Sequence, residues 1–432
     1  MELDFKDISK AHFIGIGGIG ISAIARMMNL EGKHVSGSDR DESEVTAELE
    51  KLGISVAIGQ KAENIDPKTD LVVYSVAVPD DNPELMRAKE LGIPRITYPQ
   101  ALSILSKDKF TIAVSGTHGK TTTTAMIAKV MMDAGLDPTV IVGSFLKDHK
   151  SNFVAGKSKY LVVEACEYRR SFLNLHPSIL VVTNIDDDHL DYYKDINDIA
   201  SAFAELASQI KPDGFLVCNK EYPHIEAVLK RAKCTVEDYE LFGDWNLKLK
   251  IPGRHNLENA AAVLAVADIL GISRAAAKKS LEDFSGTWRR FEHRGTMKNG
   301  VEVYDDYGHH PTEVKATLEG AREFFGTKEI TVVFQPHLYS RTKQHLHAFG
   351  LSFAAADHVI VAPIYPAREP FDPEISSEMV AEEACKAGVD AMALPSFTAI
   401  EERLKNALTD SNQVLITMGA GEANKIGDRL LE

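Results

Sequence analysis

The residues best suited to chemistry lie in a short glycine-bearing stretch, Ser115-Gly116-Thr117-His118-Gly119-Lys120-Thr121-Thr122. An apolar run typical of a buried strand occupies residues 110–114, and an apolar helical pattern that ends at Gly135 follows the stretch. Backbone N–H groups at the start of such a helix bind phosphate, a lysine adds a mobile positive charge, and a threonine hydroxyl can bind Mg²⁺. The stretch therefore predicts a phosphate site, although Val114 stands where the strict P-loop pattern has a glycine.

A second glycine turn lies near the start of the chain and follows a strand-like run at residues 12–16. It has the full G-x-G-x-x-G pattern, with Gly15, Gly17, Gly18 and Gly20. Ser38 and Asp39 end the next strand about twenty residues later, where dinucleotide-binding folds place a carboxylate that binds ribose. Alone, the turn favours an NAD-dependent oxidoreductase, but a UDP-linked substrate also carries a pyrophosphate and a ribose. A turn needed only for helix–strand packing is the simplest alternative.

Candidate metal ligands follow two further apolar runs. The stretch Glu164-Ala165-Cys166-Glu167 comes after the run at residues 160–163, and an acidic run with His189 comes after residues 178–182. Residues past the carboxyl ends of parallel strands line the ligand crevice, so Glu164 and Thr121 can hold Mg²⁺ there. His189 is either a second ligand or a histidine hydrogen-bonded among neighbouring acids. We expect the acids at residues 186–188 to be mainly solvated surface.

Three further clusters suit a nucleotide or an amino acid. Asn256 and Asn259 share one face of a helix, although Asn256 alone would serve as an N-cap. Two adjacent arginines follow Trp288, and a turn at residues 304–311 holds two acids and two histidines. A helix N-cap requires only one of these acid or histidine side chains, so capping alone does not account for the cluster.

Composition limits the class of protein. The chain has 432 residues, of which 44% are hydrophobic and 26% charged, with a net charge of −15. This acidity argues against nucleic acid or an anionic membrane as the main partner. The four cysteines lack metal-binding or disulfide spacing, and no signal peptide or transmembrane run is visible, so we expect a cytoplasmic protein.

Strand and helix signals alternate along the whole chain, which predicts parallel sheets covered by helices. We expect three domains, at residues 1–108, 109–286 and 287–432. In the third domain, one of the predicted helices spans residues 343–354.

With these motifs, the chain resembles the Mur ligase family, from the first glycine turn to Gly419-Ala420-Gly421. The family uses the shorter phosphate loop, which accounts for Val114. Two stretches, at residues 305–313 and 335–342, resemble the alanine-adding member. The resemblance implies an α/β fold of three domains, with a Rossmann-like N-terminal domain, a central P-loop-type ATPase domain and a Rossmann-like C-terminal domain.

The resemblance also implies a function for individual residues. Lys120, Arg290, His337 and Arg341 would be catalytic, the last two near the incoming amino acid. ATP would be bound by Gly116, Thr117, His118, Gly119, Lys120, Thr121, Thr122, Asn256, Asn259, Arg290 and Asp306. The UDP-sugar would be bound by Gly15, Gly17, Gly18, Gly20, Ser38 and Asp39, and two Mg²⁺ ions by Thr121, Glu164 and His189.

The implied reaction is the ATP-dependent ligation of L-alanine to UDP-N-acetylmuramate by a monomer or homodimer. A relative that adds a whole tripeptide is the nearest alternative, and an oxidoreductase is the alternative from another class. Either His337 or His309 could deprotonate the amine. Some positions depart from the commonest motif: Leu338 replaces an arginine, Glu422 an aspartate, and Cys166 and Tyr168 lie in a stretch that is acidic in many relatives.

Overall fold

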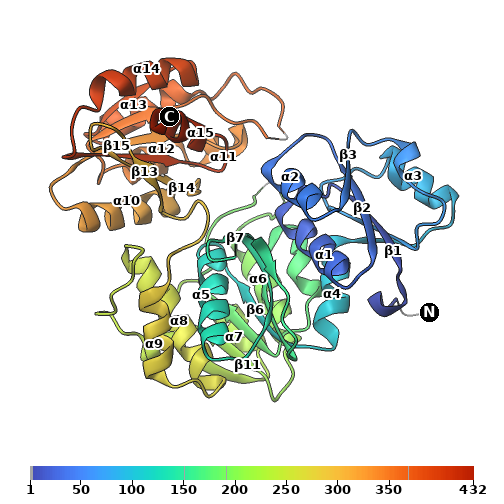
Figure 1. Cartoon of the computed structure of the whole chain (residues 1–432). Coiled ribbons are helices and arrows are strands. Elements are labelled where there is room, and N and C mark those ends of the chain that lie inside the picture. Colours follow the sequence, from blue (N-terminus) through green and yellow to red (C-terminus); the bar gives the residue numbers. More distant parts are fainter. Residues whose placement is uncertain (1–2, 150, 191, 368) are drawn as a thin grey trace. The chain divides into compact units, whose positions relative to one another are not determined.

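The computed structural model describes residues 3–149, 151–190, 192–367 and 369–432. The chain divides into two compact units, of which the first holds residues 1–243 and 260–281 and the second holds residues 244–259 and 282–432. Three β-sheets follow one another along the sequence, two in the first unit and one in the second (Figure 1). The prediction of three consecutive α/β folds is confirmed.

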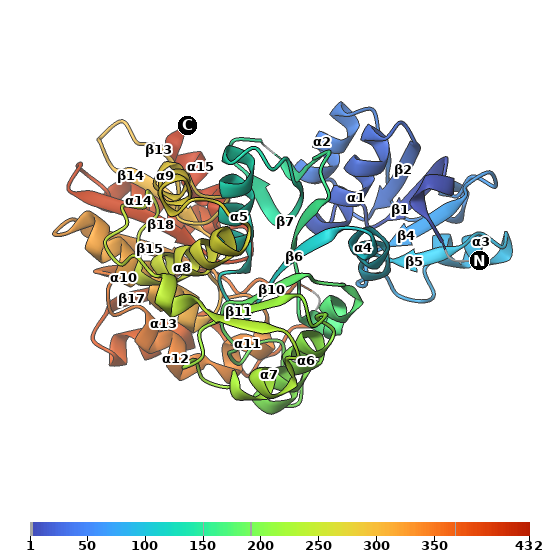
Figure 2. The ribbon, with the colours of Figure 1, turned by 90° about the horizontal axis from the view of Figure 1, so that it is seen from below.

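The first sheet is wholly parallel and has the strand order β3-β2-β1-β4-β5. The order reverses between β1 and β4, so a ligand crevice is expected at the carboxyl end of β1, where the first glycine turn begins. Helix α4 lies beside β4 and β5 (Figure 2). The elements are η1 (Phe5–Asp7), β1 (Lys10–Ile14), α1 (Ile19–Leu30), β2 (His34–Asp39), α2 (Glu44–Lys51), β3 (Ser55–Ile58), η2 (Ala62–Asn64), β4 (Leu71–Tyr74), α3 (Pro83–Glu90), β5 (Arg95–Thr97) and α4 (Tyr98–Lys107).

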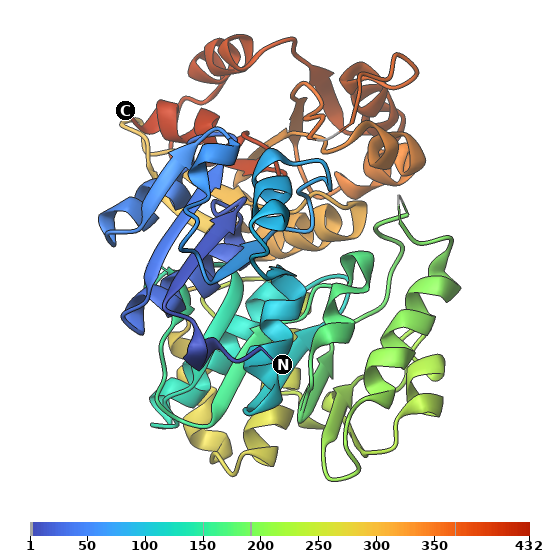
Figure 3. The same ribbon diagram turned by 90° about the vertical axis from the view of Figure 1, so that its right-hand side faces the viewer.

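The second sheet has the order β12-β11-β10-β6-β9-β7-β8, with β8 as an antiparallel edge strand. The phosphate loop joins β6, at the centre of the sheet, to α5. Helices α6 and α7 lie side by side (Figure 3). The elements are β6 (Phe110–Ser115), α5 (Lys120–Asp133), β7 (Thr139–Leu146), β8 (Ser151–Val154), β9 (Tyr160–Glu164), η3 (Tyr168–Asn174), β10 (Ile179–Val182), α6 (Ile196–Ser208), β11 (Phe215–Cys218), α7 (Glu226–Arg231), β12 (Thr235–Asp238) and η4 (Tyr239–Phe242).

The third sheet has the order β13-β14-β18-β15-β16-β17. Among the described strands of this sheet, only the edge strand β13 is antiparallel to its neighbour. Helices α8 (Arg254–Ile269) and α9 (Arg274–Asp283) contribute to both units. The remaining elements are β13 (Glu292–Thr296), β14 (Glu302–Asp306), α10 (Pro311–Phe325), β15 (Glu329–Phe334), α11 (Tyr339–Gln344), α12 (Leu346–Ser352), β16 (His358–Val361), α13 (Ser377–Lys386), β17 (Asp390–Ala393), α14 (Phe397–Ala407), β18 (Gln413–Met418) and α15 (Asn424–Leu431).

The apolar strands of the third sheet are buried on both faces. Successive side chains of a strand point to opposite faces, and Val332 lies in one hydrophobic cluster while Val333 lies in another. Because both faces of the sheet are covered, the sequence of the strand is a continuous apolar run, as in other parallel strands of α/β folds.

One predicted helix is wrong. The predicted helix at residues 343–354 is two helices, α11 and α12, which meet at His345, where φ is −105° and ψ is 17°. The apolar periodicity carries across this break and conceals it. None of the helices in the described part of the chain combines the length and the apolar character that crossing a bilayer requires.

Candidate active site

The phosphate loop forms a tight turn at the end of β6. Gly116 and Gly119 have φ values of 134° and 81°, a left-handed backbone that glycine adopts without strain. A Cβ atom at Gly116 would lie 2.0 Å from the hydroxyl oxygen of Thr183. Gly119 caps α5 without a side-chain hydrogen bond, so the first N–H groups of this helix are available to an anion.

The loop is held by the segment that follows β10. The backbone N–H of His118 donates to the Asn184 side chain at 2.8 Å, and the His118 ring lies 3.0 Å from the Asp186 carboxylate. Thr117 and Asp186 also exchange hydrogen bonds between side chain and backbone. The Asp186 side chain is 37% exposed, as expected for an acid at the surface, and it also holds the phosphate loop in place.

Lys120 is paired with a carboxylate that sequence reasoning did not select. Its ammonium lies 2.9 Å from Glu167 Oε1 and also donates to the carbonyl oxygens of Gly116 and Thr117. Glu167 is buried, with a side chain only 2% exposed. Burial disfavours the charged form of Lys120, but the neighbouring negative charges, Glu167 first and Glu164 after it, and the hydrogen bond to Glu167 together outweigh this effect and raise the pKa of the ammonium. Lys120 is therefore charged at physiological pH.

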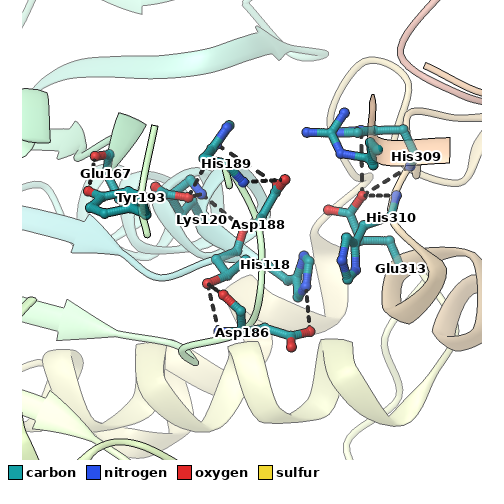
Figure 4. A network of polar contacts seen from close by, with 12 residues as sticks. His118, Lys120, Glu167, Asp186, Asp188, His189, Tyr193, His309, His310 and Glu313 are labelled. Atoms are coloured by element: carbon teal, nitrogen blue, oxygen red, sulfur yellow. Dashed lines mark hydrogen bonds and ion pairs between the residues drawn. The ribbon is translucent and has the colours of Figure 1, made fainter. Parts of the chain in front are cut away.

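His189 lies next to the same carboxylate (Figure 4). Its Nε2 atom is 3.7 Å from Glu167 Oε1 and 3.9 Å from Asp188 Oδ2. The backbone of His189 is left-handed, with φ at 56°. Tyr193 donates its hydroxyl hydrogen to the Glu167 carbonyl at 2.5 Å and holds that backbone in place.

The site has the donors that a divalent cation needs. Glu167 Oε2 and His189 Nδ1 are buried and have no hydrogen-bond partner among the described residues. Glu164, at the end of β9, accepts a hydrogen bond from the Gly143 N–H at 2.8 Å, and Thr121 is the second residue of α5. Carboxylate and hydroxyl oxygens are the ligands that Mg²⁺ prefers. The residues present therefore fit a magnesium ion.

The first glycine turn is held together by the end of β2. The N–H groups of Gly15 and Ile16 donate to the Ser38 carbonyl, whereas the Ser38 hydroxyl is buried and bonds to Glu84. Asp39 accepts the Gly17 N–H at 2.8 Å. The predicted residues Ser38 and Asp39 therefore do contact the turn. The Gly18 N–H donates to the Gly15 carbonyl, and Gly18 caps α1 without a side-chain hydrogen bond.

One cavity of the first unit is lined by residues that belong to both of its α/β domains. It has a volume of about 240 Å³, and its wall includes Gly20 and Tyr98 from the first sheet's domain and Glu164, Cys166 and Ser171 from the second. A Cβ atom at Gly20 would lie 2.7 Å from the Tyr98 ring, so the glycine lets the turn approach the ring. The cavity therefore links the first glycine turn to the strand end near Lys120.

In the second unit, the two adjacent arginines differ in environment. The Arg289 side chain is 5% exposed, and its guanidinium contacts the Asp305 carboxylate at 2.7 Å and the carbonyl oxygens of Gly419 and Gly421. Arg290 is more exposed and lies 3.9 Å from Glu313 and 5.3 Å from the centre of the Tyr307 ring. Arg289 is therefore structural, and Arg290 is the arginine with access to a ligand.

Asp306 is placed at the same turn. Its carboxylate accepts the backbone N–H groups of Phe291 and Gly308, each at 2.8 Å. Burial raises the pKa of Asp306 to about 6, while Arg290 and these two N–H groups oppose the increase. Both oxygens of Asp306 thus orient the turn that carries Arg290.

Asn256 and Asn259 lie together at the start of α8. Asn256 is inside the helix and donates its amide hydrogen to the Pro252 carbonyl, so it is not an N-cap. Asn259 donates to the Asn256 side-chain oxygen at 3.3 Å, as their spacing predicts.

The predicted amino-acid residues form a third cluster. The Arg341 guanidinium lies 3.1 Å from His337 Nδ1, and the His337 ring stacks on Tyr365 with ring centres 5.7 Å apart. Leu338 is 3% exposed with φ at 71°, so the residue that replaces an arginine is a buried helix cap. His309 meets the edge of the His337 ring at 5.7 Å.

Family models match three consecutive parts of the chain. The Mur ligase family catalytic domain matches residues 10–110, the Mur ligase middle domain residues 114–244, and the Mur ligase glutamate ligase domain residues 289–421. The chain belongs to the Mur ligase family, and the resemblance drawn from its motifs is confirmed.

Within this family the chain is similar to ligases named for L-alanine. It is 42% identical to the UDP-N-acetylmuramate–L-alanine ligase of Clostridium kluyveri in an alignment that covers 100% of both chains. The corresponding ligase of Caldanaerobacter subterraneus is 41% identical and aligns over 100% of this chain and 99% of its own. The crystal structure of the UDP-N-acetylmuramate–alanine ligase of Thermotoga maritima has a TM-score of 0.83 and 31% identity, and the match covers 98% of each chain.

Replacement of Glu167 tests its competition with phosphate for Lys120. In Glu167→Gln, the buried ammonium loses its counter-charge, so we expect a lower melting temperature without ligand, because breaking a buried pair costs up to about 3–5 kcal/mol. Magnesium-free ADP should raise the melting temperature of this variant more than that of the wild type. Glu164→Gln is the matched comparison, because Glu164 acts on Lys120 only through its charge and bonds to Gly143, so its ADP shift should be smaller than that of Glu167→Gln. Equal ADP shifts in Glu167→Gln and wild type would contradict the competition.

The environment of Arg289 predicts a stability effect that its neighbour lacks. Arg289→Met leaves Asp305 buried without its ion-pair partner, so we expect a loss of about 3–5 kcal/mol, measured as a lower urea midpoint. Arg290→Met removes a partly exposed side chain and should move the midpoint much less. Similar shifts in the two variants would show that the distinction is wrong.

Proposed function

We propose that this protein joins L-alanine to UDP-N-acetylmuramate at the expense of ATP, giving UDP-N-acetylmuramoyl-L-alanine, ADP and phosphate. The observation that carries the proposal is the shared cavity of the first unit, lined by Gly20 of one glycine turn and by Glu164 near Lys120. A nucleotide sugar held at the first turn can extend through this cavity toward the phosphate loop. Full-length similarity to ligases of this name supports the same reaction.

The chemistry explains why two anion sites are needed. A carboxylate is a poor electrophile, so the γ-phosphoryl group of ATP is transferred to the lactyl carboxylate, which becomes an acyl phosphate. The alanine amine then attacks the acyl carbon, and phosphate leaves from the tetrahedral intermediate. Both partners of the first step are anions, so positive charge has to offset their repulsion.

The chain supplies this positive charge at defined places. Lys120 lies in the phosphate loop, and a phosphate that enters there replaces Glu167 as the partner of its ammonium. Arg290 is proposed to reach the ATP phosphates, and Asp306 to position the turn that carries it. Mg²⁺, when bound, neutralises phosphate charge, and Thr121, Glu164 and His189 are the residues proposed to hold it.

Hydrogen-bonding partners indicate the tautomers of the two candidate bases for the amine. The guanidinium of Arg341 is always a donor, so His337 Nδ1 is an acceptor and carries no proton. His309 Nδ1 faces the Tyr307 carbonyl at 3.1 Å, so it carries the proton and the lone pair lies on Nε2. Both His337 and His309 therefore remain proposed as the base for the amine.

The reaction is tested by phosphate release. The purified protein is incubated with ATP, Mg²⁺ and UDP-N-acetylmuramate, and with L-alanine, L-serine, glycine or the murein tripeptide in turn. We expect release with L-alanine and little with the tripeptide. Turnover with the tripeptide but not with L-alanine would identify a murein-recycling ligase and refute the proposal.

Replacement of Lys120 separates the two anion sites. Lys120→Ala should reduce turnover by at least about 10²–10³-fold, because removing one preorganised charge from a transition state has this effect. Binding of UDP-N-acetylmuramate, measured by calorimetry, should persist. Loss of UDP-sugar binding together with turnover would show that the two sites are assigned wrongly.

A further inference from the structure

The loop after β9 contains two consecutive arginines with unusual backbones. Arg169 has φ at 51° and ψ at 30°, and Arg170 has φ at 55° and ψ at 26°. For residues other than glycine, this left-handed conformation costs about 1–2 kcal/mol each. Glycine or asparagine would form the same turn with less strain, so the arginine side chains are expected to contribute something that repays the cost.

The two side chains have different surroundings. Arg170 is paired with Asp198 at 2.6 Å and with Glu205 at 3.4 Å. Arg169 is exposed, and its Nη1 atom donates to the Val76 carbonyl at 3.2 Å. Within the described residues, no carboxylate forms an ion pair with Arg169. Arg170 thus fastens the loop to α6, whereas the charge of Arg169 is not neutralised by the described part of the chain.

The contact with Val76 places this charge beside the first glycine turn. Val76 belongs to a turn in which the Val78 N–H donates to the Ser75 carbonyl at 3.0 Å. That turn packs against Gly15, because a Cβ atom at Gly15 would lie 3.2 Å from Ser75 Cβ and 3.6 Å from Val78 Cγ2. The guanidinium therefore lies next to the residues that begin the glycine turn.

The cavity of the first unit lies beside the loop that carries Arg169, and part of its wall is formed by sequence neighbours of that residue. Cys166 and Ser171 flank Arg169 in the sequence and line this cavity together with Gly20. The loop that carries Arg169 is therefore part of the wall of a space that also opens on the first glycine turn.

The first glycine turn needs an additional positive charge if it is to bind a pyrophosphate. The carboxylate of Asp39 lies 2.8 Å from the Gly17 nitrogen, so the charged group bonded to the turn is negative. A pyrophosphate carries about two negative charges, which the partial positive charge of a helix N-terminus does not balance. Arginine presents a fork of N–H donors that matches two phosphate oxygens.

We propose that Arg169 binds the pyrophosphate of a nucleoside diphosphate sugar. The second α/β domain thus contributes a specificity residue to the nucleotide-sugar site of the first. This inference rests on the proposed function, because it needs a UDP-linked substrate at the first glycine turn. Arg169 acts in binding and is separate from the groups that contact ATP.

Calorimetry with Arg169→Gln, Arg169→Lys and Arg170→Gln tests the assignment. UDP-N-acetylmuramate, UDP and ATP are titrated into each full-length variant and into the wild type. We expect Arg169→Gln to weaken both uridine ligands by about 10- to 100-fold, the range for a hydrogen bond between charged groups, and to leave ATP within twofold. Arg169→Lys should restore part of the affinity, and Arg170→Gln should leave it within twofold.

The glutamine variant distinguishes binding from a structural contact. Its amide can still donate to the Val76 carbonyl but carries no charge. If Arg169→Gln binds the uridine ligands as tightly as the wild type, the contact is structural only and the inference is wrong. A parallel loss of ATP affinity would also overturn it. If the wild type binds no UDP-N-acetylmuramate, the proposed function fails as well, whereas wild-type binding with an unaffected variant refutes the inference alone.

Discussion

The buried ion pair between Lys120 and Glu167 is the interaction on which the organisation of the first unit depends. A lysine directed into a phosphate loop has a high cost when no anion is present, because its charge is shielded from water. Glu167 meets this cost with a carboxylate 2.9 Å away, and Tyr193 fixes the backbone of that residue. The site is therefore folded and electrically balanced before a nucleotide arrives, and binding becomes an exchange of one anion for another.

This exchange connects several segments that are distant in sequence. Movement of Glu167 would change the surroundings of His189, whose Nε2 atom lies 3.7 Å from its carboxylate. It would also displace the left-handed loop that begins after Glu167. The same loop carries Arg169, which contacts the turn beside Gly15. A phosphate at Lys120 and a pyrophosphate at the first glycine turn thus act on the two ends of one short segment. Such an arrangement supports coupling between the two binding events.

Much of the architecture could be predicted from the sequence, because it depends on local patterns. Apolar runs bounded by glycine located the central strands, and the spacing of Gly15, Gly17 and Gly20 located a turn that Asp39 does contact. Asn256 and Asn259 were paired correctly by helical spacing. These features need only a few consecutive residues and the geometry of one element.

The features that were missed depend on contacts that the sequence does not contain. Glu164 and Glu167 belong to one short stretch, yet Glu167 bonds to Lys120 whereas Glu164 bonds to the Gly143 N–H. The contact of Asp186 with His118 was not predicted, because the two residues lie 68 positions apart in the sequence. Arg289 and Arg290 are chemically identical neighbours, yet one is buried against Asp305 and the other is accessible. The break between α11 and α12 was hidden by uninterrupted apolar spacing.

Gly116 has a consequence for how glycine motifs are interpreted in sequence searches. Its missing side chain makes room for Thr183 at the end of the neighbouring strand. Selection on this position therefore comes first from the packing of two strands, and a descendant that no longer used ATP would still need a glycine there. A glycine at this position therefore indicates how the sheet is packed, and the lysine four residues later indicates whether phosphate can be bound. Searches for lost enzymatic activity in related chains should weigh these two positions separately.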